Sequence, residues 1–299
     1  MVCKRKIFDL PAEDLPKRWY NIIPELPSNF PAPRDPEQGP SRLKSLKEIF
    51  TKNALEQEKL KEKHFKIPEE VRELYIHSGR PRPLIRAIGL EEKLDTPAKL
   101  YYKAEFESPT GSHKVNTAIA QAYYAKKEGV ERLTTETGAG QWGTALAYAA
   151  SLVGLDVTVY WVRAASSWKE DRRNLMNLYG AEVHDSPSEN TEIGKKILND
   201  KSGHEGSLGI AISEAIEEAK KDKKTAYSLG SVLNHVLLHQ TIIGLEAKNQ
   251  FEMADDYPDT VLSCVGGGSN FGGLAIPFIA DRLNNEYNTV QKKTPGRSD

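Results

Sequence analysis

Three consecutive glycines stand where an apolar segment meets a predicted helix. The stretch "VLSCVGGGSN" occupies residues 261–270, and "FGGLAIPFIADRL" follows it. Three glycines let successive backbone N–H groups turn toward one point, and a helix start adds about half a positive charge. Ser269 and Asn270 can add side-chain hydrogen bonds. The pattern predicts that Gly266, Gly267 and Gly268 bind one small phosphate. It matches neither the dinucleotide fingerprint nor a P-loop, and a merely tight strand-to-helix turn stays an alternative.

A second glycine-rich loop, "ETGAGQWG" (136–143), also lies between a predicted strand and a predicted helix. Its backbone N–H groups can face a carboxylate as readily as a phosphate. Glu136 stands at the carboxyl end of the strand, where ligands bind in open α/β sheets. By itself, Glu136 is more simply explained as a solvated carboxylate or one that interacts with a helix start.

Lys114 lies in "SPTGSHKVN" (108–116), behind a Pro-Thr-Gly turn and at a predicted helix start. Most lysines are solvated. Here a positive helix end and burial would both favour the neutral amine, which is the form that captures a carbonyl group. A phosphate site, a carboxylate loop and a nucleophilic lysine together predict pyridoxal phosphate acting on an amino acid. The phosphate would anchor the cofactor, and Lys114 would form the Schiff base.

Strand and helix patterns alternate from residue 99 onward. Strands are predicted at 99–106, 132–136, 156–162, 181–186, 225–229 and 259–265. Helices are predicted at about 113–128, 144–153, 168–179, 191–200, 207–221, 236–254 and 271–283, the first of them capped by Ser112. Apolar, β-branched strands in this alternation indicate parallel sheet with right-handed crossovers.

The first 80 residues differ from the rest of the chain. Residues 11–40 contain eight prolines, which predict an extended, irregular arm. Trp19, Tyr20, Ile22 and Ile23 lie within it and are expected to pack on the body of the protein or on a partner subunit. Residues 41–76 are predicted to be helical.

The composition excludes several classes of protein. The 41 basic and 42 acidic residues nearly cancel, which argues against binding to nucleic acid or a membrane surface. Two cysteines, Cys3 and Cys264, provide neither a disulfide framework nor metal-ligand spacing. We find no signal peptide and no apolar stretch of about 20 residues, so a cytoplasmic protein without metal is expected.

Six motifs of the chain form a recognisable set: "SPTGSHKVNTA", "TETGAGQWG", "YGAEV", "GSLGIAISEA", "YSLGSVLNHVLLHQTIIGLEA" and "CVGGGSN". Together they resemble the tryptophan synthase beta family, which belongs to the fold-type II pyridoxal-phosphate enzymes. The "LPKRWYNIIPELP" arm, and Trp142 where the commoner branch has a histidine, are similar to the longer, tryptophan-synthase-beta-like branch. The likeness runs from about residue 11 to about 283.

This resemblance implies roles for individual residues. Lys114 would carry the cofactor and later move the α-proton. Glu136 would assist departure of the serine hydroxyl and then stabilise the indole ring as its C3 attacks. His113 would lie beside the cofactor phosphate, which Gly266, Gly267, Gly268, Ser269 and Asn270 would hold; Thr137, Gly138, Ala139, Gly140 and Gln141 would bind the substrate carboxylate; and Ser231 would lie near the cofactor ring. His235 and His239 receive no role.

The resemblance also implies an organisation and a reaction. Two open parallel-sheet lobes are expected. The pyridoxal-phosphate lobe would comprise residues 81–128 and 222–283, and the mobile substrate-closing lobe would comprise residues 129–221. A Pro-rich N-terminal region of 1–80 would precede them, and a disordered polar tail of 284–299 would follow. Family members continue well beyond residue 299, so the cofactor lobe is expected to be incomplete at its C-terminus.

The implied reaction joins L-serine or O-phosphoserine to indole to give L-tryptophan. A homodimer is implied, and an alpha chain is a possible partner. Serine deamination, sulfide-based β-replacement and an impaired fragment that only binds a partner stay open as alternatives.

Overall fold

The computed structural model describes residues 6–31 and 42–284. Contacts between residues divide the chain into two compact units. Unit 1 comprises residues 1–26, 61–109 and 237–299, and unit 2 comprises residues 27–60 and 110–236. The lobe boundaries implied by the resemblance stay a prediction.

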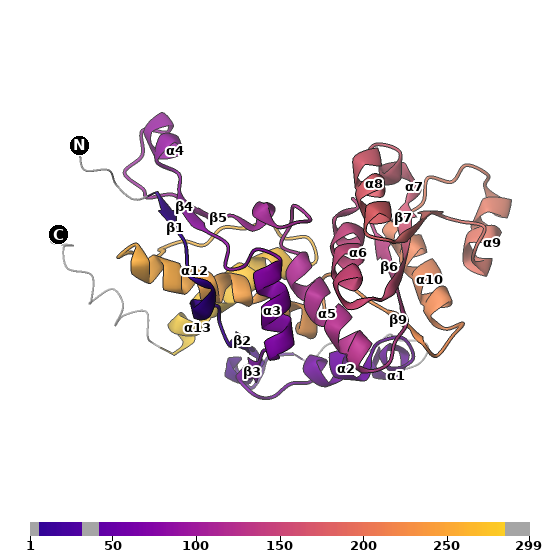
Figure 1. Cartoon of the computed structure of the whole chain (residues 1–299), viewed down its shortest axis with the longest axis horizontal. Coiled ribbons are helices and arrows are strands. Elements are labelled where there is room, and N and C mark those ends of the chain that lie inside the picture. Colours follow the sequence, from indigo (N-terminus) through magenta and orange to yellow (C-terminus); the bar gives the residue numbers. More distant parts are fainter. Residues whose placement is uncertain (1–5, 32–41, 285–299) are drawn as a thin grey trace. The chain divides into compact units, whose positions relative to one another are not determined.

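Unit 2 is built on a four-stranded parallel sheet with the strand order β8-β7-β6-β9. Figure 1 labels β6, β7 and β9 of this sheet. The strands are β6 (Arg132–Thr137), β7 (Asp156–Val162), β8 (Glu182–Ser186) and β9 (Thr225–Tyr227). The two central strands are buried along most of their length, which suits their β-branched and aromatic residues. The α/β class with a parallel sheet, predicted from the sequence, is confirmed.

Helices cover both faces of this sheet. Those of unit 2 are α1 (Arg42–Lys47), α2 (Lys52–Glu58), α5 (Val115–Lys127), α6 (Gln141–Val153), α7 (Arg163–Ser166), α8 (Glu170–Leu178), α9 (Glu192–Asp200) and α10 (Leu208–Ala219). On one face, a Cβ at Gly143 of α6 would come within 2.9 Å of Val159. On the other face, the Thr134 hydroxyl donates to the Ala215 carbonyl of α10 at 2.9 Å. Because side chains alternate along a strand, α6 and α10 lie on opposite faces.

Unit 1 contains two small antiparallel sheets. One has the order β1-β4-β5, and the other pairs β2 with β3. Its strands are β1 (Ile7–Phe8), β2 (Arg18–Tyr20), β3 (His64–Lys66), β4 (Leu84–Arg86) and β5 (Tyr101–Lys103). Its helices are α3 (Glu69–His77), α4 (Ile88–Lys93), α12 (Ile242–Met253) and α13 (Ser269–Leu283), with short 3-10 turns at Ala12–Asp14, Ile23–Glu25 and Glu105–Glu107.

The N-terminal arm packs its aromatic residues within unit 1. Trp19 is fully buried, stacks on Phe65 with ring centroids 6.2 Å apart, and lies 4.6 Å from the ring of His239. The backbone N–H of Tyr20 donates to the Thr241 hydroxyl at 3.0 Å. The expectation that the arm packs on the body of the protein is therefore confirmed for this part of it. Residues 32–41 lie outside the described residues.

Several predictions about elements are wrong in detail. Residues 41–76 are not helical throughout, because β3 separates α2 from α3 and pairs with the arm strand β2. The helix expected at 236–254 is two helices, α11 (Asn234–Gln240) and α12. Thr241 separates them, and its hydroxyl donates back to the Leu238 carbonyl at 2.6 Å, a local bond that competes with the helical pattern.

The strand expected at 259–265 is not a strand in the structure. Leu262 and Val265 are 82% and 67% exposed, and no described strand pairs with this segment. An apolar, β-branched pattern forms a strand only where a neighbouring strand accepts its backbone hydrogen bonds. A second parallel sheet is likewise absent from the described ranges, since β4 and β5 pair antiparallel. Apart from Asn284, the predicted polar tail lies outside the described residues.

Candidate active site

Glu136 lies at the carboxyl end of β6, next to the last residue of the strand. It is 5% exposed, and this burial raises the pKa of its carboxyl from 4.5 to about 7. A hydrogen bond from the Tyr227 hydroxyl and the positive charge of Lys114 act in the opposite direction and lower that pKa. Glu136 is therefore a buried carboxyl that can exchange a proton near neutral pH, not a solvated one.

Two side chains from other elements of unit 2 interact with Glu136, one through a hydrogen bond and one through its charge. The Tyr227 hydroxyl, at the end of β9, donates to Oε2 of Glu136. Lys114 precedes α5 and is half-buried. The family resemblance implied that Lys114 and Glu136 act in one active site, and in the structure the positive charge of Lys114 lowers the pKa of Glu136. Sequence reasoning did not identify Tyr227, although the position of this tyrosine near the end of a strand adjacent to β6 was a usable signal.

The helix of Lys114 begins differently from the prediction. Lys114 itself is the N-cap residue of α5, with helical backbone angles and no side-chain cap bond. The Ser112 hydroxyl accepts from the Lys114 N–H at 3.4 Å, so Ser112 supports the lysine backbone instead of capping the helix. His113, between them, is half-buried.

Three carbonyl groups of the loop after β6 accept hydrogen bonds from side chains. Trp161 Nε1 donates to the Gly138 carbonyl at 2.8 Å, and Arg172 Nη1 donates to the Ala139 carbonyl at 2.5 Å. The Thr144 hydroxyl donates to the Gly140 carbonyl at 2.8 Å.

The amides of this loop are not used in the same way. Within the described part of the chain, the backbone N–H groups of Ala139, Gly140 and Gln141 have no acceptor, and Gln141 opens α6. Gly140 has φ of 89°, and a Cβ there would lie 2.8 Å from the Trp161 ring. Unpaired amides at a helix start form a site for an anion such as a carboxylate.

Replacing Arg172 with alanine is expected to weaken binding of a carboxylate ligand to these amides. The Ala139 peptide would lose the donor that fixes its orientation, so Kd for the carboxylate should rise roughly 3- to 10-fold, as for one hydrogen bond. Titration of the protein with a small carboxylate checks this. Arg132→Ala is the matched control, because Arg132 begins β6 at the other end of the strand. An equal rise in Kd in both variants would contradict the assignment.

Trp142 connects the same strand to the segment that carries Ser231. Its indole Nε1 donates to the Thr135 hydroxyl at 2.6 Å, and that hydroxyl donates in turn to the Ser228 carbonyl at 2.6 Å. A Cβ on Gly230 would overlap the Trp142 ring, so only glycine allows this approach. Ser231 follows directly and is half-buried. Its predicted place near a cofactor ring stays a prediction.

In unit 1, the three glycines lead into the start of α13. Gly268 is the N-cap residue with φ of 89°, a backbone conformation that favours glycine, and Ser269 begins the helix and is buried. A Cβ on Gly266 or Gly268 would meet no atom within 4 Å, so space is open beside the loop. The Asn270 amide nitrogen contacts Sγ of Cys264 at 3.0 Å. Open space next to glycine amides at the first turn of a 15-residue helix suits a phosphate group.

The buried histidines take part in packing. His235 Nδ1 lies 3.3 Å from Oε2 of Glu58, and His239 packs against Trp19. No cluster of three or more potential metal-ligating side chains occurs among residues 6–31 and 42–284, and no helix in these ranges is long and apolar enough to cross a membrane.

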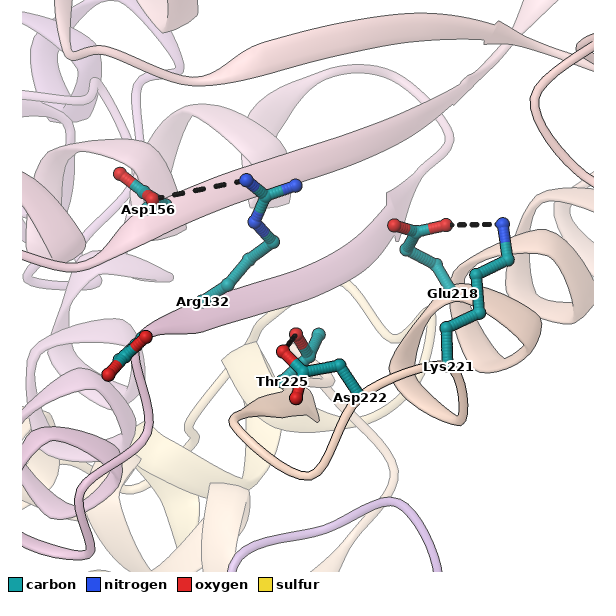
Figure 2. A pocket seen from close by; sticks show the side chains of 7 residues that line it. Arg132, Asp156, Glu218, Lys221, Asp222 and Thr225 are labelled. Atoms are coloured by element: carbon teal, nitrogen blue, oxygen red, sulfur yellow. Dashed lines mark hydrogen bonds and ion pairs between the residues drawn. The ribbon is translucent and has the colours of Figure 1, made fainter.

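A separate cavity of about 200 Å³ lies at the opposite edge of the parallel sheet (Figure 2). Arg132, Asp156 and Thr225 line it, and each is the first residue of a strand. Figure 2 shows that its side chains pair with one another, as Lys221 does with Glu218 at 2.8 Å. Ligands of open α/β sheets bind at the carboxyl ends of the strands, where Glu136 and the amide-presenting loop lie.

Comparison with curated proteins identifies close relatives. The chain is 58% identical over 275 residues to tryptophan synthase beta chain 2 of Methanothermobacter thermautotrophicus, which is 92% of this chain and 64% of that protein. It is 58% identical over 284 residues to tryptophan synthase beta chain 2 of Pyrococcus furiosus, and 56% identical over 285 residues to that of Aeropyrum pernix, each time 94% of this chain and 64% of the relative. The chain thus spans 64% of the length of these relatives.

Solved structures show the same fold. A fungal L-serine ammonia-lyase from Rhizomucor miehei matches with a TM-score of 0.51 and 18% identity, over 67% of this chain and 56% of that one. A pyridoxal 5'-phosphate-dependent aspartate racemase matches with a TM-score of 0.52 and 22% identity, over 74% and 62%.

The family described as pyridoxal-phosphate dependent enzyme matches residues 77–291, a range that includes Lys114, Glu136 and both glycine-rich loops. Because this match covers most of the chain, and because the solved structures share its fold, the chain belongs to the pyridoxal-phosphate-dependent enzyme family, of fold-type II.

Proposed function

We propose that the protein is a tryptophan synthase beta-type enzyme, which joins the side-chain carbon of L-serine, or of O-phosphoserine, to C3 of indole and releases water or phosphate. The names of its relatives support this reaction. The observation that carries the proposal is Glu136, a buried carboxyl with a pKa of about 7 that faces Lys114 and adjoins a loop of unpaired amides. This combination provides an acid-base group beside an amine and a carboxylate site.

The cofactor of this family is pyridoxal 5'-phosphate, and the residues of the chain fit it. Gly266, Gly267, Gly268, Ser269 and Asn270 would hold its phosphate, and His113 would lie beside that group. Lys114 would bind its aldehyde, and Ser231 would lie near its ring. The open space beside Gly266 and Gly268 supports the phosphate role. When bound, the cofactor supplies an electron sink for the α-carbon of the amino acid.

Residues of the chain bind the substrate and transfer its protons. The amides of the loop formed by Thr137, Gly138, Ala139, Gly140 and Gln141 bind the substrate carboxylate and orient the amino acid. The Lys114 amine takes the α-proton. Glu136 donates a proton to the departing β-oxygen of serine, and its carboxylate then accepts the indole N–H while C3 forms the new bond.

A reaction assay separates this proposal from its alternatives on the same scaffold. With serine and indole, the enzyme is expected to form tryptophan, while serine alone should release little pyruvate. Pyruvate release that indole does not suppress would favour a serine deaminase, and a preference for sulfide over indole would favour another β-replacement. A side chain placed to accept an indole N–H has no partner in sulfide, which is why Glu136 favours the indole reaction.

The binding of the cofactor phosphate can be tested at Gly268. Gly268→Ala places a methyl group in the open space beside the loop, where the cofactor phosphate would lie, and should weaken cofactor binding about tenfold. The backbone strain at φ of 89°, about 1–2 kcal/mol, lowers the stability of the apoenzyme and the holoenzyme alike. Titration of the apoenzyme with pyridoxal phosphate, followed by absorbance, measures the change in binding. Gly203→Ala is the control, because Gly203 has φ of 77° and equally open surroundings on α9's side of unit 2. Unchanged binding in Gly268→Ala would place the phosphate elsewhere.

We further propose that the enzyme is a cytoplasmic homodimer and that an alpha chain can be its partner. The family resemblance supports the dimer and the partner, and the lack of a membrane-crossing helix in the described ranges is compatible with a cytoplasmic location. Light scattering of the purified protein, alone and mixed with an alpha chain, tests both assemblies.

A further inference from the structure

We infer that Tyr227 is a positioning residue for Glu136: its hydroxyl fixes one carboxylate oxygen and leaves the other to the substrate. This inference rests on the proposed role of Glu136. The Tyr227 hydroxyl donates to Oε2. No side chain among residues 6–31 and 42–284 donates to the second oxygen, Oε1, although the carboxyl also accepts from its own backbone N–H. One oxygen is thus anchored by a side chain, and the other has no side-chain donor.

The sheet register brings the two residues together. Tyr227 pairs with Thr134, two residues before Glu136 on β6. Because side chains on a strand alternate, Thr134 and Glu136 share a face, and Tyr227 shares it with them. A tyrosine side chain extends from the Thr134 position far enough to reach the carboxylate beyond it.

Packing keeps the phenol in this orientation. Tyr227 is 4% exposed, and its ring meets Phe50 edge to face with centroids 5.3 Å apart. Its backbone N–H donates to the Ile49 carbonyl at 2.8 Å. Burial, this ring contact and the backbone bond together hold the phenol against Glu136.

Tyr227 also affects the pKa of Glu136. Burial and the neighbouring Glu136 raise the pKa of the Tyr227 phenol, so it remains a proton donor at all working pH values. The charged or titratable groups that act on Glu136 are Tyr227 on β9 and Lys114 before α5, and both lower its pKa. Tyr160, which pairs with Glu136 on β7, is instead surrounded by Glu214, Glu217 and Glu218 of α10 and Glu182 of β8. Without the phenol, only the backbone hydrogen bond of Glu136 and the charge of Lys114 would offset the effect of burial on this pKa.

The test is the titration of Glu136 in Tyr227→Phe. Removing the hydroxyl should raise the apparent pKa of the carboxyl by about one pH unit, because a hydrogen bond to the charged form is lost. The protonated-carboxyl infrared band, identified by its absence in Glu136→Gln, reports this titration whether or not the enzyme turns over. The same upward shift is expected in the pH profile of kcat for tryptophan synthesis.

Two further variants make the result decisive. Tyr148→Phe removes another buried phenol, one that meets Tyr179 edge to face at 5.2 Å, and should leave the titration unchanged. Incorporation of 3-fluorotyrosine at position 227 keeps the ring and strengthens the donor, so the pKa of Glu136 should fall. An unchanged titration in Tyr227→Phe, or equal shifts in Tyr227→Phe and Tyr148→Phe, would overturn the inference. A shifted infrared titration with an unshifted kcat profile would retain the contact but refute the proposed role of Glu136.

Discussion

Lys114→Ala is expected to remove the visible absorbance band of the lysine-bound cofactor and to lower tryptophan formation by about 10²–10⁴-fold. The amine would both hold the cofactor and move the α-proton, and no other described lysine is known to act on Glu136. Absorbance of the purified holoenzyme, followed by single-turnover kinetics with serine and indole, measures both effects.

A lysine on the same helix provides the control for this variant. Lys127 is exposed in the last turn of α5, and its ammonium lies 5.4 Å from the Tyr123 ring centre. Lys127→Ala should retain the band and the activity. A persistent band in Lys114→Ala would show that another amine binds the cofactor, and the proposed site would then be wrong.

Glu136→Gln is expected to leave the cofactor band in place while tryptophan formation falls by about 10²–10⁴-fold. The amide keeps the size of the carboxyl but neither donates an acidic proton to the serine oxygen nor accepts the indole N–H as a carboxylate. Glu131→Gln is the matched control, because Glu131 is exposed just before β6. Retained indole coupling in Glu136→Gln would refute the acid-base role.

The same substitution has an expected effect on stability. Burial raises the pKa of Glu136 from 4.5 to about 7, so between these values the folded state binds a proton that the unfolded state has lost. The free energy of unfolding therefore falls as pH rises through this window, by on the order of 3 kcal/mol in total. Glutamine does not titrate, so Glu136→Gln should lose less stability than the parent between pH 5 and pH 8. Urea unfolding at the two pH values checks this, and identical losses would contradict the buried, titrating carboxyl.

Local sequence patterns were sufficient for the parallel sheet and its helices. β7 matches the predicted bounds of 156–162, and β6, β8 and α10 differ from theirs by one or two residues. These elements are encoded by runs of β-branched residues, by helical spacing and by glycines, all of which act within a few residues. For the same reason, the loop after β6 and the turn before α13 could be located from the sequence, and their role as anion sites stays a prediction.

Partners distant in sequence could not be predicted in this way. Glu136 has a raised pKa because unit 2 folds around it, and Tyr227, which donates to it, lies 91 residues further on. The donors that turn the carbonyls of Gly138 and Ala139 come from 23 and 33 residues away.

The tertiary structure also decided where apolar segments pair. Residues 259–265 have the composition of a strand, yet no described strand pairs with them. β4 and β5 pair with each other in the antiparallel direction. By itself, the sequence determined where the strands, helices and glycine-rich loops of the parallel sheet occur, because conformational preferences act within a few residues. Only the tertiary structure decided which groups are buried together and how they titrate, since burial and hydrogen bonding depend on chain segments that no local pattern connects.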